Sequence, residues 1–205
     1  MTSNLARAKA AEALRRLGHA IVAHDPDDAL MERVAEAADR ATSMLAETAP
    51  RRRNLVALKQ SVYEDDPELG ERIHHFDECF VSGTQNPLGI GLEVFREGDE
   101  VVARVVLGAA FEGAPGRSHG GIVAAIFDDV LGYVLSLIRT PAFTGSLTID
   151  YLAATPIGEP LLFRARLADR DGRKLFIEGE CTHDGVLLAR ARATFIQVDP
   201  SRFRP

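Results

Sequence analysis

The chain has 205 residues, 46% of them hydrophobic, and a formal net charge of −6 at pH 7. This length and composition can bury a core, so one domain with an appendage is expected. The mildly acidic balance argues against a general nucleic-acid-binding protein. The chain has two cysteines and no signal-peptide pattern, which favours a soluble, reduced protein of the cytoplasm. Asp128 and Asp129 interrupt the best apolar run, so no membrane span is expected.

The first 53 residues are predicted to form a helical hairpin attached to a main domain of residues 54–205. Residues 4–24 place apolar side chains on one stripe, as in an amphipathic helix. Asp25 and Pro26 restart the pattern, and a second helix continues until Pro50. The three arginines that follow are interpreted as a solvated linker rather than a phosphate-binding cluster. The hairpin carries no recognisable chemistry, so it is expected to pack on the domain or to mediate assembly.

Strands are predicted on both sides of one long helix. Before it, residues 91–96 and 100–107 alternate or are rich in valine, and a Glu-Gly-Asp turn joins them. After it, four strand-like segments are separated by turn residues and cover residues 145–153, 161–168, 175–181 and 187–198. Strands and helices do not alternate as a doubly wound sheet requires. The expected class is therefore α+β, with an antiparallel sheet of about six strands wrapped around a long central helix.

That helix is predicted over residues 122–138, where apolar residues recur at a helical period. Ser118 is expected to cap it, after a turn at Pro115 and Gly116. Apolar side chains cover most of its circumference, so it should be buried. The remaining face carries Asp128 among small residues. A lone buried carboxylate costs several kcal/mol unless it is hydrogen-bonded or protonated, so Asp128 has a functional role, faces solvent, or is satisfied by a buried backbone group.

Gly120 and Gly121 at the start of the helix would offer unpaired N–H groups at the positive end of its dipole. Alternatively, they only permit a tight entry turn. With Asp128 they would form two parts of an acyl-transfer site. Gly121 and Asp128 lie about 10 Å apart along the axis, too far for one carbonyl and its water to contact both. If both act in one reaction, two copies of the helix must meet at a dimer interface. Asp129, about 100° further round, is expected to support Asp128 or to face solvent.

A competing motif lies in the same loop. Residues 116–120 match G-x-S-x-G, the nucleophile elbow of serine hydrolases, with Ser118 as the nucleophile. That fold needs a mostly parallel sheet and a downstream acid and histidine, whereas only His183 follows, in a predicted hairpin turn. Ser118 is therefore better explained as a helix cap.

No metal site is expected. His74 and His75 are adjacent on an extended segment, so they point to opposite sides. Cys79 and Ser82 form an incomplete Cys-x-x-Cys pair, which argues against zinc.

Three motifs have a characteristic spacing: E-G-x-P-G at residues 112–116, H-G-G at residues 119–121, and Asp128 nine positions after the histidine. Together they resemble the hotdog-fold acyl-CoA thioesterases of the PaaI-like, phenylacetic-acid-degradation type. Residues 79–89 and 172–176 are similar too, and the likeness covers roughly residues 75–199. The resemblance implies a hotdog fold, dimers that pair their sheets, and two active sites across the dimer interface.

The resemblance also implies roles for single residues. Asp128 would be the general base or nucleophile, and Gly121, with Gly120 beside it, the backbone donor to the carbonyl oxygen. His119 would orient the loop, and Thr144 would help to place the attacking water. Candidate substrate contacts are Gly120, Asn86, Gly113, Arg117, Arg173 and Lys174. Some members have an asparagine where this chain has Gly113, so carbonyl recognition differs here or the substrate is not an arylacetyl thioester.

The expected function is hydrolysis of an acyl-CoA thioester to free acid and CoA. No cofactor is expected, because coenzyme A is part of the substrate, and Arg117, Arg173 and Lys174 could hold its phosphates. The expected partner is a second copy of the chain, in a dimer or a tetramer, with neither nucleic acid nor membrane. Two alternatives stay open: an acyl-thioester hydratase or dehydratase that uses His119 with a carboxylate, and a non-enzymatic acyl-CoA-binding protein.

Overall fold

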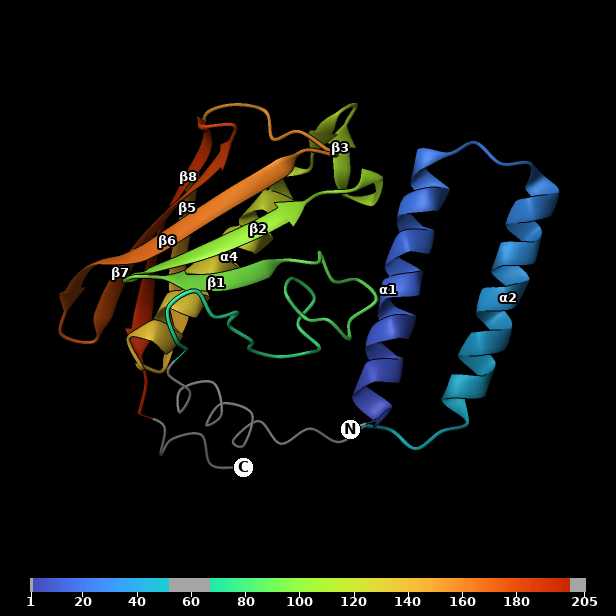
Figure 1. Cartoon of the computed structure of the whole chain (residues 1–205), viewed down its shortest axis with the longest axis horizontal. Helices are drawn as coiled ribbons and strands as arrows, with labels where there is room; N and C mark the ends of the chain where they lie inside the picture. The colour runs from blue at the N-terminus through green and yellow to red at the C-terminus, as the bar shows by residue number, and fades with distance from the viewer. Residues whose placement is uncertain (1, 52–66, 200–205) are drawn as a thin grey trace.

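The structure, a computed structural model, describes residues 2–51 and 67–199. Figure 1 shows a helical pair beside a body in which a sheet encloses one helix. The helices are α1 (Thr2–Ala23), α2 (Asp28–Ala46), the short 3-10 helix η1 (Ala109–Phe111) and α4 (Gly120–Leu137). The strands are β1 (Glu93–Glu97), β2 (Glu100–Val106), β3 (Glu112–Ala114), β4 (Arg117–Ser118), β5 (Ala142–Tyr151), β6 (Pro160–Asp171), β7 (Lys174–His183) and β8 (Val186–Gln197).

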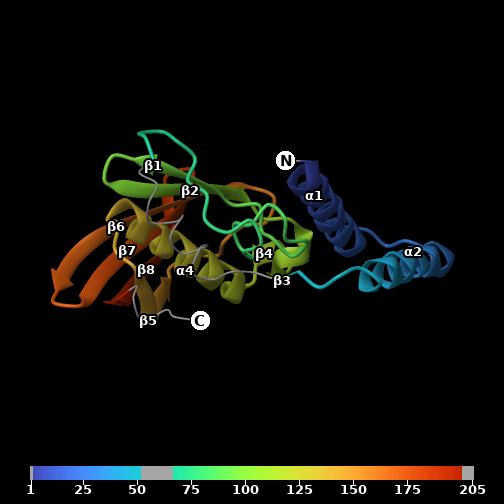
Figure 2. The ribbon, with the colours of Figure 1, turned by 90° about the horizontal axis from the view of Figure 1, so that it is seen from below.

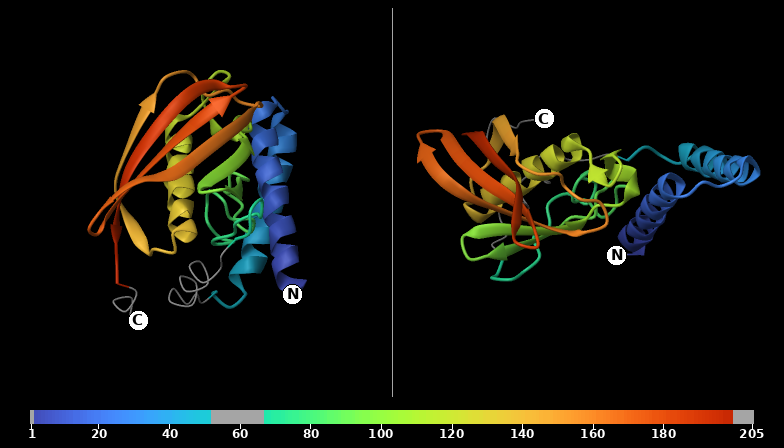
Figure 3. Two further views of the ribbon diagram at one scale, coloured as in Figure 1. Left: turned by 60° about the vertical axis from the view of Figure 1, so that its left-hand side comes forward. Right: turned by 90° about the horizontal axis from the view of Figure 1, so that it is seen from above.

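Six strands form one sheet in the order β1-β2-β6-β7-β8-β5, and every neighbouring pair is antiparallel. The sheet curves around α4, as the left view of Figure 3 shows. The predicted α+β arrangement is therefore confirmed. All six predicted strands are present, and most of the strands after the helix are longer than predicted. The small pair β3 and β4 in the loop before α4 was not predicted.

The core lies between α4 and the inner face of the sheet. Nine residues of α4 are buried, and the Phe127 ring meets the Phe163 ring of β6 edge-on at 5.1 Å between centroids. By length and composition alone, α4 would suffice to cross a membrane. Its burial explains this hydropathy, because a helix enclosed by a sheet must also be apolar on most sides.

The turn residues fix how the long strands pair. Asp184 and Gly185, between β7 and β8, both have positive φ, at 47° and 78°. A two-residue hairpin turn with two left-handed residues matches the natural twist of the strands, and Asp-Gly suits it. His183, which the sequence pattern places in the turn, is therefore the last residue of β7 and pairs with Val186 across the turn.

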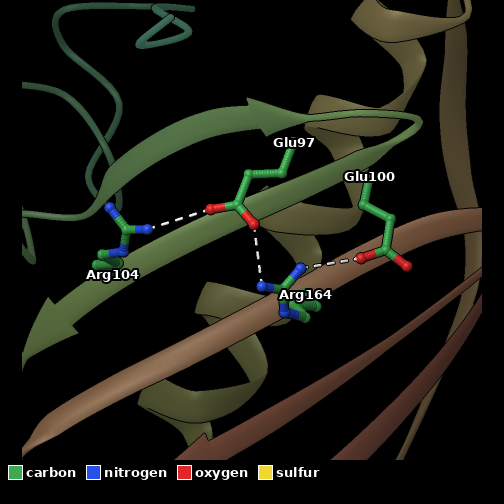
Figure 4. Close-up of polar contacts among 4 residues, drawn as sticks. All are labelled: Glu97, Glu100, Arg104 and Arg164. Carbon is green, nitrogen blue, oxygen red and sulfur yellow. Dashed lines mark hydrogen bonds and ion pairs between the residues drawn. The ribbon is translucent and has the colours of Figure 1, made fainter. Parts of the chain in front are cut away.

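Charged side chains on the outer face of the sheet tie the β1–β2 hairpin to β6. Arg164 donates to Glu97 at 3.0 Å and to Glu100 at 3.1 Å, and Arg104 donates to the other oxygen of Glu97 at 3.1 Å (Figure 4). All four side chains are more than a third exposed, so each pair is expected to stabilise by about 0.2–1 kcal/mol.

The N-terminal helices form the predicted hairpin, which stands beside the body. Figures 1 and 2 show α2 further from the sheet than α1. None of the residues of α2 is buried, whereas α1 packs on η1 and buries Ala11. Asp27 caps α2 by accepting a hydrogen bond from the Leu30 N–H at 2.7 Å.

The junction between the helices and the body is described only in part. The predicted domain boundary after residue 53, with Arg52 and Arg53, lies outside the described residues. Arg51 is described, and it forms an ion pair with Glu78 in the connector, which is the segment of residues 67–92 that leads into β1. That arginine therefore has a protein partner rather than only solvent.

Candidate active site

The N-terminal end of α4 is capped by His119. Its Nδ1 atom accepts a hydrogen bond from the Gly121 N–H at 2.9 Å. The prediction that Ser118 caps the helix is wrong, because Ser118 belongs to β4 and pairs with Glu112 of β3. β4 ends at Ser118 and α4 begins at Gly120, so His119 between them takes the capping position.

This cap decides which glycine is open to a ligand. The Gly121 N–H, expected to polarise a substrate carbonyl, is occupied by the His119 ring. Within the part of the chain that the structure describes, the Gly120 N–H has no hydrogen-bond partner. The Gly120 carbonyl accepts a hydrogen bond from the Tyr151 hydroxyl of β5 at 2.8 Å, which holds this peptide in place. Gly120 is therefore the available backbone donor in this structure.

A cavity of about 360 Å³ opens at this end of α4. Gly120 and Tyr151 line it together with Arg117, Val123 and residues of the segment 153–155. Gly113 also lies at its wall. An added Cβ on that glycine would lie 2.7 Å from the His119 Cα, so an asparagine there would require His119 to shift. The glycine thus lets β3 pass closely behind the capping histidine.

Asp128 lies further along α4, on a side that the sheet does not cover. It is exposed, and its Oδ1 atom accepts a hydrogen bond from the Thr144 hydroxyl of β5 at 2.9 Å. Asp128 and Thr144, two separately predicted site residues, therefore meet in the structure. Because Thr144 bonds only one carboxylate oxygen, the other can accept a hydrogen bond from a water.

The position of β5 leaves this pair at an edge of the sheet. β5 is the last strand in the order, and most of its ten residues are exposed. Asp128 is eight residues beyond Gly120, which corresponds to about 12 Å along the helix axis. Within one chain, the open N–H and the carboxylate are therefore too far apart to act on the same carbonyl carbon.

Asp129 occupies a different environment from its neighbour. Its Oδ1 atom accepts a hydrogen bond from the Cys79 thiol at 3.5 Å, and its Oδ2 atom is buried with no hydrogen-bond partner in the described residues. Burial raises the pKa of Asp129, and the nearby Ser82 and Cys79 side chains oppose this change. Asp129 thus anchors α4 to the connector instead of facing solvent.

A row of polar side chains continues from Asp129 along the same side of α4. Tyr133 donates to the Ser82 hydroxyl at 3.0 Å and stacks on the His75 ring, with 3.6 Å between centroids. The His75 Nε2 atom lies 2.6 Å from the hydroxyl of the buried Ser136. Burial lowers the pKa of His75 to about 3, so the ring is neutral at pH 7. The spacing 129, 133, 136 is a helical stripe, a signal that could have revealed this network in the sequence.

The other predicted contacts are scattered. The Asn86 amide donates to the Glu78 carbonyl and accepts from the Leu88 N–H, both at 2.9 Å, so it shapes the connector. Arg173 and Lys174 are exposed at the turn between β6 and β7, and Lys174 pairs with the strand next to β5. Arg117 lies at the opposite end of α4, beside the cavity. One chain does not bring the three basic residues together.

The sequence also raised the questions of a serine-hydrolase nucleophile elbow and of a metal site. The antiparallel sheet does not provide the parallel strands of a nucleophile elbow, and the His183 Nδ1 atom contacts the Pro160 carbonyl oxygen at 2.9 Å. Among residues 2–51 and 67–199, no cluster of three or more His, Cys, Asp or Glu side chains could hold a metal ion.

Part of the chain is similar to proteins of a known family. Residues 116–189 match the family model described as the Thioesterase superfamily. The acyl-coenzyme A thioesterase THEM4 of Bos taurus is 29% identical over 143 residues, which are 67% of this chain and 59% of the bovine protein. THEM4 of Mus musculus is 31% identical over 122 residues, or 56% of this chain and 52% of the mouse protein. The chain thus spans little more than half the length of these relatives.

A solved structure supports the fold. A crystal structure of a thioesterase superfamily protein is 28% identical to this chain and superposes with a TM-score of 0.79, covering 93% of this chain and 90% of the other. The central helix wrapped by a six-stranded antiparallel sheet is the hotdog fold, as the sequence motifs predict.

Proposed function

We propose that this chain belongs to the thioesterase superfamily and that it hydrolyses acyl-CoA thioesters to a free acid and CoA. The observation that carries the proposal is the 2.9 Å hydrogen bond between Thr144 and Asp128 on the exposed side of α4. A carboxylate held in one orientation, with its second oxygen open, suits a general base or a nucleophile. The relatives named as acyl-coenzyme A thioesterases support the choice of substrate.

In the proposed reaction, Asp128 takes a proton from a water while the water oxygen attacks the thioester carbonyl carbon. Negative charge then develops on the carbonyl oxygen, where the Gly120 N–H at the positive end of α4 can stabilise it. One such donor typically contributes about 10²–10³-fold in rate. The carbon–sulfur bond breaks, and the CoA thiolate leaves and takes up a proton. In the alternative form of this step, the Asp128 carboxylate attacks the carbonyl carbon directly and forms an anhydride as the CoA thiolate leaves. Water then hydrolyses the anhydride.

The separation of about 12 Å between Gly120 and Asp128 implies that two copies of the chain build each site. We propose a homodimer in which the exposed edge strand β5 pairs with a second copy. Unpaired edge strands readily pair with another strand, and β5 is a ten-residue edge next to Asp128. Analytical ultracentrifugation checks this proposal, since a chain that stays monomeric at assay concentration yet turns over substrate would contradict it.

The hydrolase and the hydratase alternatives differ in the role of His119. A hydratase would use this histidine as an acid or base, but its Nδ1 atom is committed to the cap of α4. Incubation with an enoyl-CoA separates the two, because hydration removes the conjugated double bond without releasing a thiol. The proposed function predicts thiol release from saturated acyl-CoA substrates instead.

The decisive variant is Asp128→Asn, which keeps the shape of the side chain but removes the base. We expect thiol release to fall by roughly 1,000-fold while the far-UV circular dichroism and the melting temperature stay close to those of the wild type. Asp184→Asn is the matched control, since Asp184 is an exposed carboxylate in a turn whose left-handed conformation asparagine tolerates. Undiminished turnover by Asp128→Asn would refute the assignment.

The localisation, the cofactor requirement and the CoA-phosphate contacts are proposed from the sequence. We propose that the enzyme acts in the cytoplasm and needs no cofactor, so that dialysis against a chelator should leave thiol release unchanged. Arg117, Arg173 and Lys174 remain candidates for the CoA phosphates, and in a dimer they would have to come from two chains to meet at one substrate.

A further inference from the structure

Helix α1 contacts the segment that leads into the active-site loop. The His19 Nδ1 atom accepts a hydrogen bond from the Ala110 N–H of η1 at 3.1 Å. The same ring meets the Phe111 ring edge-on, with 5.1 Å between centroids and 77° between planes. One side chain of α1 thus makes a polar and an aromatic contact with two consecutive residues of η1.

The surroundings of His19 are shaped for this contact. An added Cβ on Gly108 would lie 2.5 Å from the His19 ring, so the close approach requires a glycine there. One turn earlier on α1, the Arg15 guanidinium donates to the Asn86 carbonyl at 2.7 Å and to the Thr84 carbonyl at 3.3 Å. Two successive turns of α1 are therefore attached to two separate segments of the body.

From η1, two further hydrogen bonds reach the proposed oxyanion site. The His119 N–H donates to the Phe111 carbonyl at 2.8 Å, and the His119 ring accepts from the Gly121 N–H at 2.9 Å. The position of Phe111 therefore fixes the backbone of His119, and His119 fixes the first turn of α4. Gly120, whose N–H is open, lies between these two bonded residues.

Helix α1 lies outside residues 116–189, where the family model matches. Residues 67–199, which form the body, make up about two thirds of the chain. The superposition on the solved thioesterase superfamily protein covers 93% of the whole chain with a TM-score of 0.79, so it has to include α1 and α2. The placement of these helices on the body therefore recurs in a solved protein that is 28% identical. A recurring placement argues against a chance contact of a loose extension.

We propose that His19 of the N-terminal hairpin is a positioning residue for the reaction, acting through η1 and His119 on the Gly120 N–H. The inference rests on the proposed function for its effect on turnover, and it gives the N-terminal extension a role in catalysis. The Nδ1 atom of His19 must be unprotonated to accept from Ala110, so the ring acts as the neutral tautomer with hydrogen on Nε2. Burial, and secondarily the charge of Arg15, lowers the pKa of His19, which favours this neutral form.

The kinetic test uses two substitutions of His19 in the full chain. They separate the effect of its hydrogen-bond acceptor from the effect of its side-chain volume. His19→Leu keeps the volume but removes the acceptor, and it should lower kcat for an acyl-CoA about tenfold with KM within about twofold, as expected for loss of one aligned hydrogen bond. His19→Asn places an oxygen near the position of Nδ1 and should recover most of kcat. His24→Ala is the matched control, because this exposed histidine directly follows α1 and its hydrogen bond in the described residues is to the Ala20 carbonyl of that helix.

A second measurement does not depend on turnover. Hydrogen exchange of the backbone amides of residues 110–121 should be faster in His19→Leu than in the wild type, and unchanged in His24→Ala. Wild-type kcat in His19→Leu would overturn the inference, as would equal losses of kcat in His19→Leu and His19→Asn. If the wild type hydrolyses no acyl-CoA, the proposed function fails, and the exchange data alone then decide whether α1 holds the loop. Unchanged exchange in His19→Leu would show that it does not.

Discussion

Two adjacent carboxylates on α4 have opposite environments. Asp128 is exposed, points towards the edge strand β5 and accepts a hydrogen bond from Thr144. Asp129 points towards the connector and keeps one oxygen buried without a partner among the described residues. The two positions differ by about 100° around the helix, which is enough to place one carboxylate at a reactive edge and the other in a packed wall.

The difference extends along both sides of α4. On the connector side, His75 and Tyr133 stack, and the buried hydroxyl of Ser136 completes a row of polar contacts. On the β5 side, Asp128 and Thr144 stay accessible. Polar groups enclosed by protein mainly determine stability, whereas exposed and oriented groups are free to react. Variants on the connector side should therefore change unfolding, and variants on the β5 side should change turnover.

The largest expected effect on the connector side is the response of His75 to acid. Burial lowers the pKa of His75 from 6.5 to about 3, so the unfolded chain binds a proton below pH 6.5 and the folded chain does not. This group therefore stabilises fully above pH 6.5, and the stability is lost as the pH falls towards 3. Between pH 7 and pH 4.5 the loss should reach about 3 kcal/mol, measured by urea unfolding.

His75→Gln isolates this contribution. Glutamine can still bond to the Ser136 hydroxyl but does not titrate, so the variant should lose less stability than the wild type between pH 7 and pH 4.5. His24→Gln, at an exposed site, should keep the wild-type dependence. Identical pH dependence in His75→Gln and the wild type would show that this ring is not what makes the connector side sensitive to acid.

A smaller effect is expected on the β5 side from Thr144. Replacing it by valine removes the hydroxyl that orients Asp128 while keeping the volume, so kcat should fall about 30-fold, or about 2 kcal/mol in activation free energy. Thr144→Ser should retain most of the activity, and the melting temperature should change little. Thr148→Val, at an exposed threonine of the same strand, is the control for β5 itself.

The smallest expected change in turnover comes from Asp129→Asn. Because burial raises the pKa of Asp129, its contribution to stability is fullest below the ordinary aspartate pKa and declines as the pH rises through the folded value. Asparagine stays neutral, so at pH 7.5 the variant should unfold at the same or a higher urea concentration than the wild type, with thiol release retained. A loss of turnover as large as in Asp128→Asn would remove the distinction between the two carboxylates.

Much of the fold could be predicted from the sequence because local patterns carried it. The six strands of the sheet, the central helix and the helical hairpin were predicted by alternation, helical period and turn residues such as Asp184 and Gly185. The start of α4 was predicted less well. Ser118 is an ordinary capping residue. Nothing in its local sequence shows that β3 and β4 pair, or that His119 is the N-cap residue as a result.

The candidate site shows the same division. The resemblance implied that Asp128 acts as the base or nucleophile and that Thr144 helps to place the water, and the structure brings these two side chains together. The choice between Gly120 and Gly121 depended on where the His119 ring points, and the burial of Asp129 depended on the connector. Neither the ring orientation nor the connector packing follows from residue type or spacing.

By itself, the sequence determined the antiparallel sheet around one long helix, its elements and the position of the carboxylates on that helix, since periodicity and turn chemistry are local properties of the chain. The hotdog fold was what the resemblance of its motifs to a family implied. Only the tertiary structure decided which N–H is open, which aspartate is buried, and that His19 lies against the segment before the active-site loop. These three facts depend on contacts between residues that are far apart in the chain, such as His19 and Ala110, or Cys79 and Asp129. Packing fixes such contacts, and no local pattern encodes them.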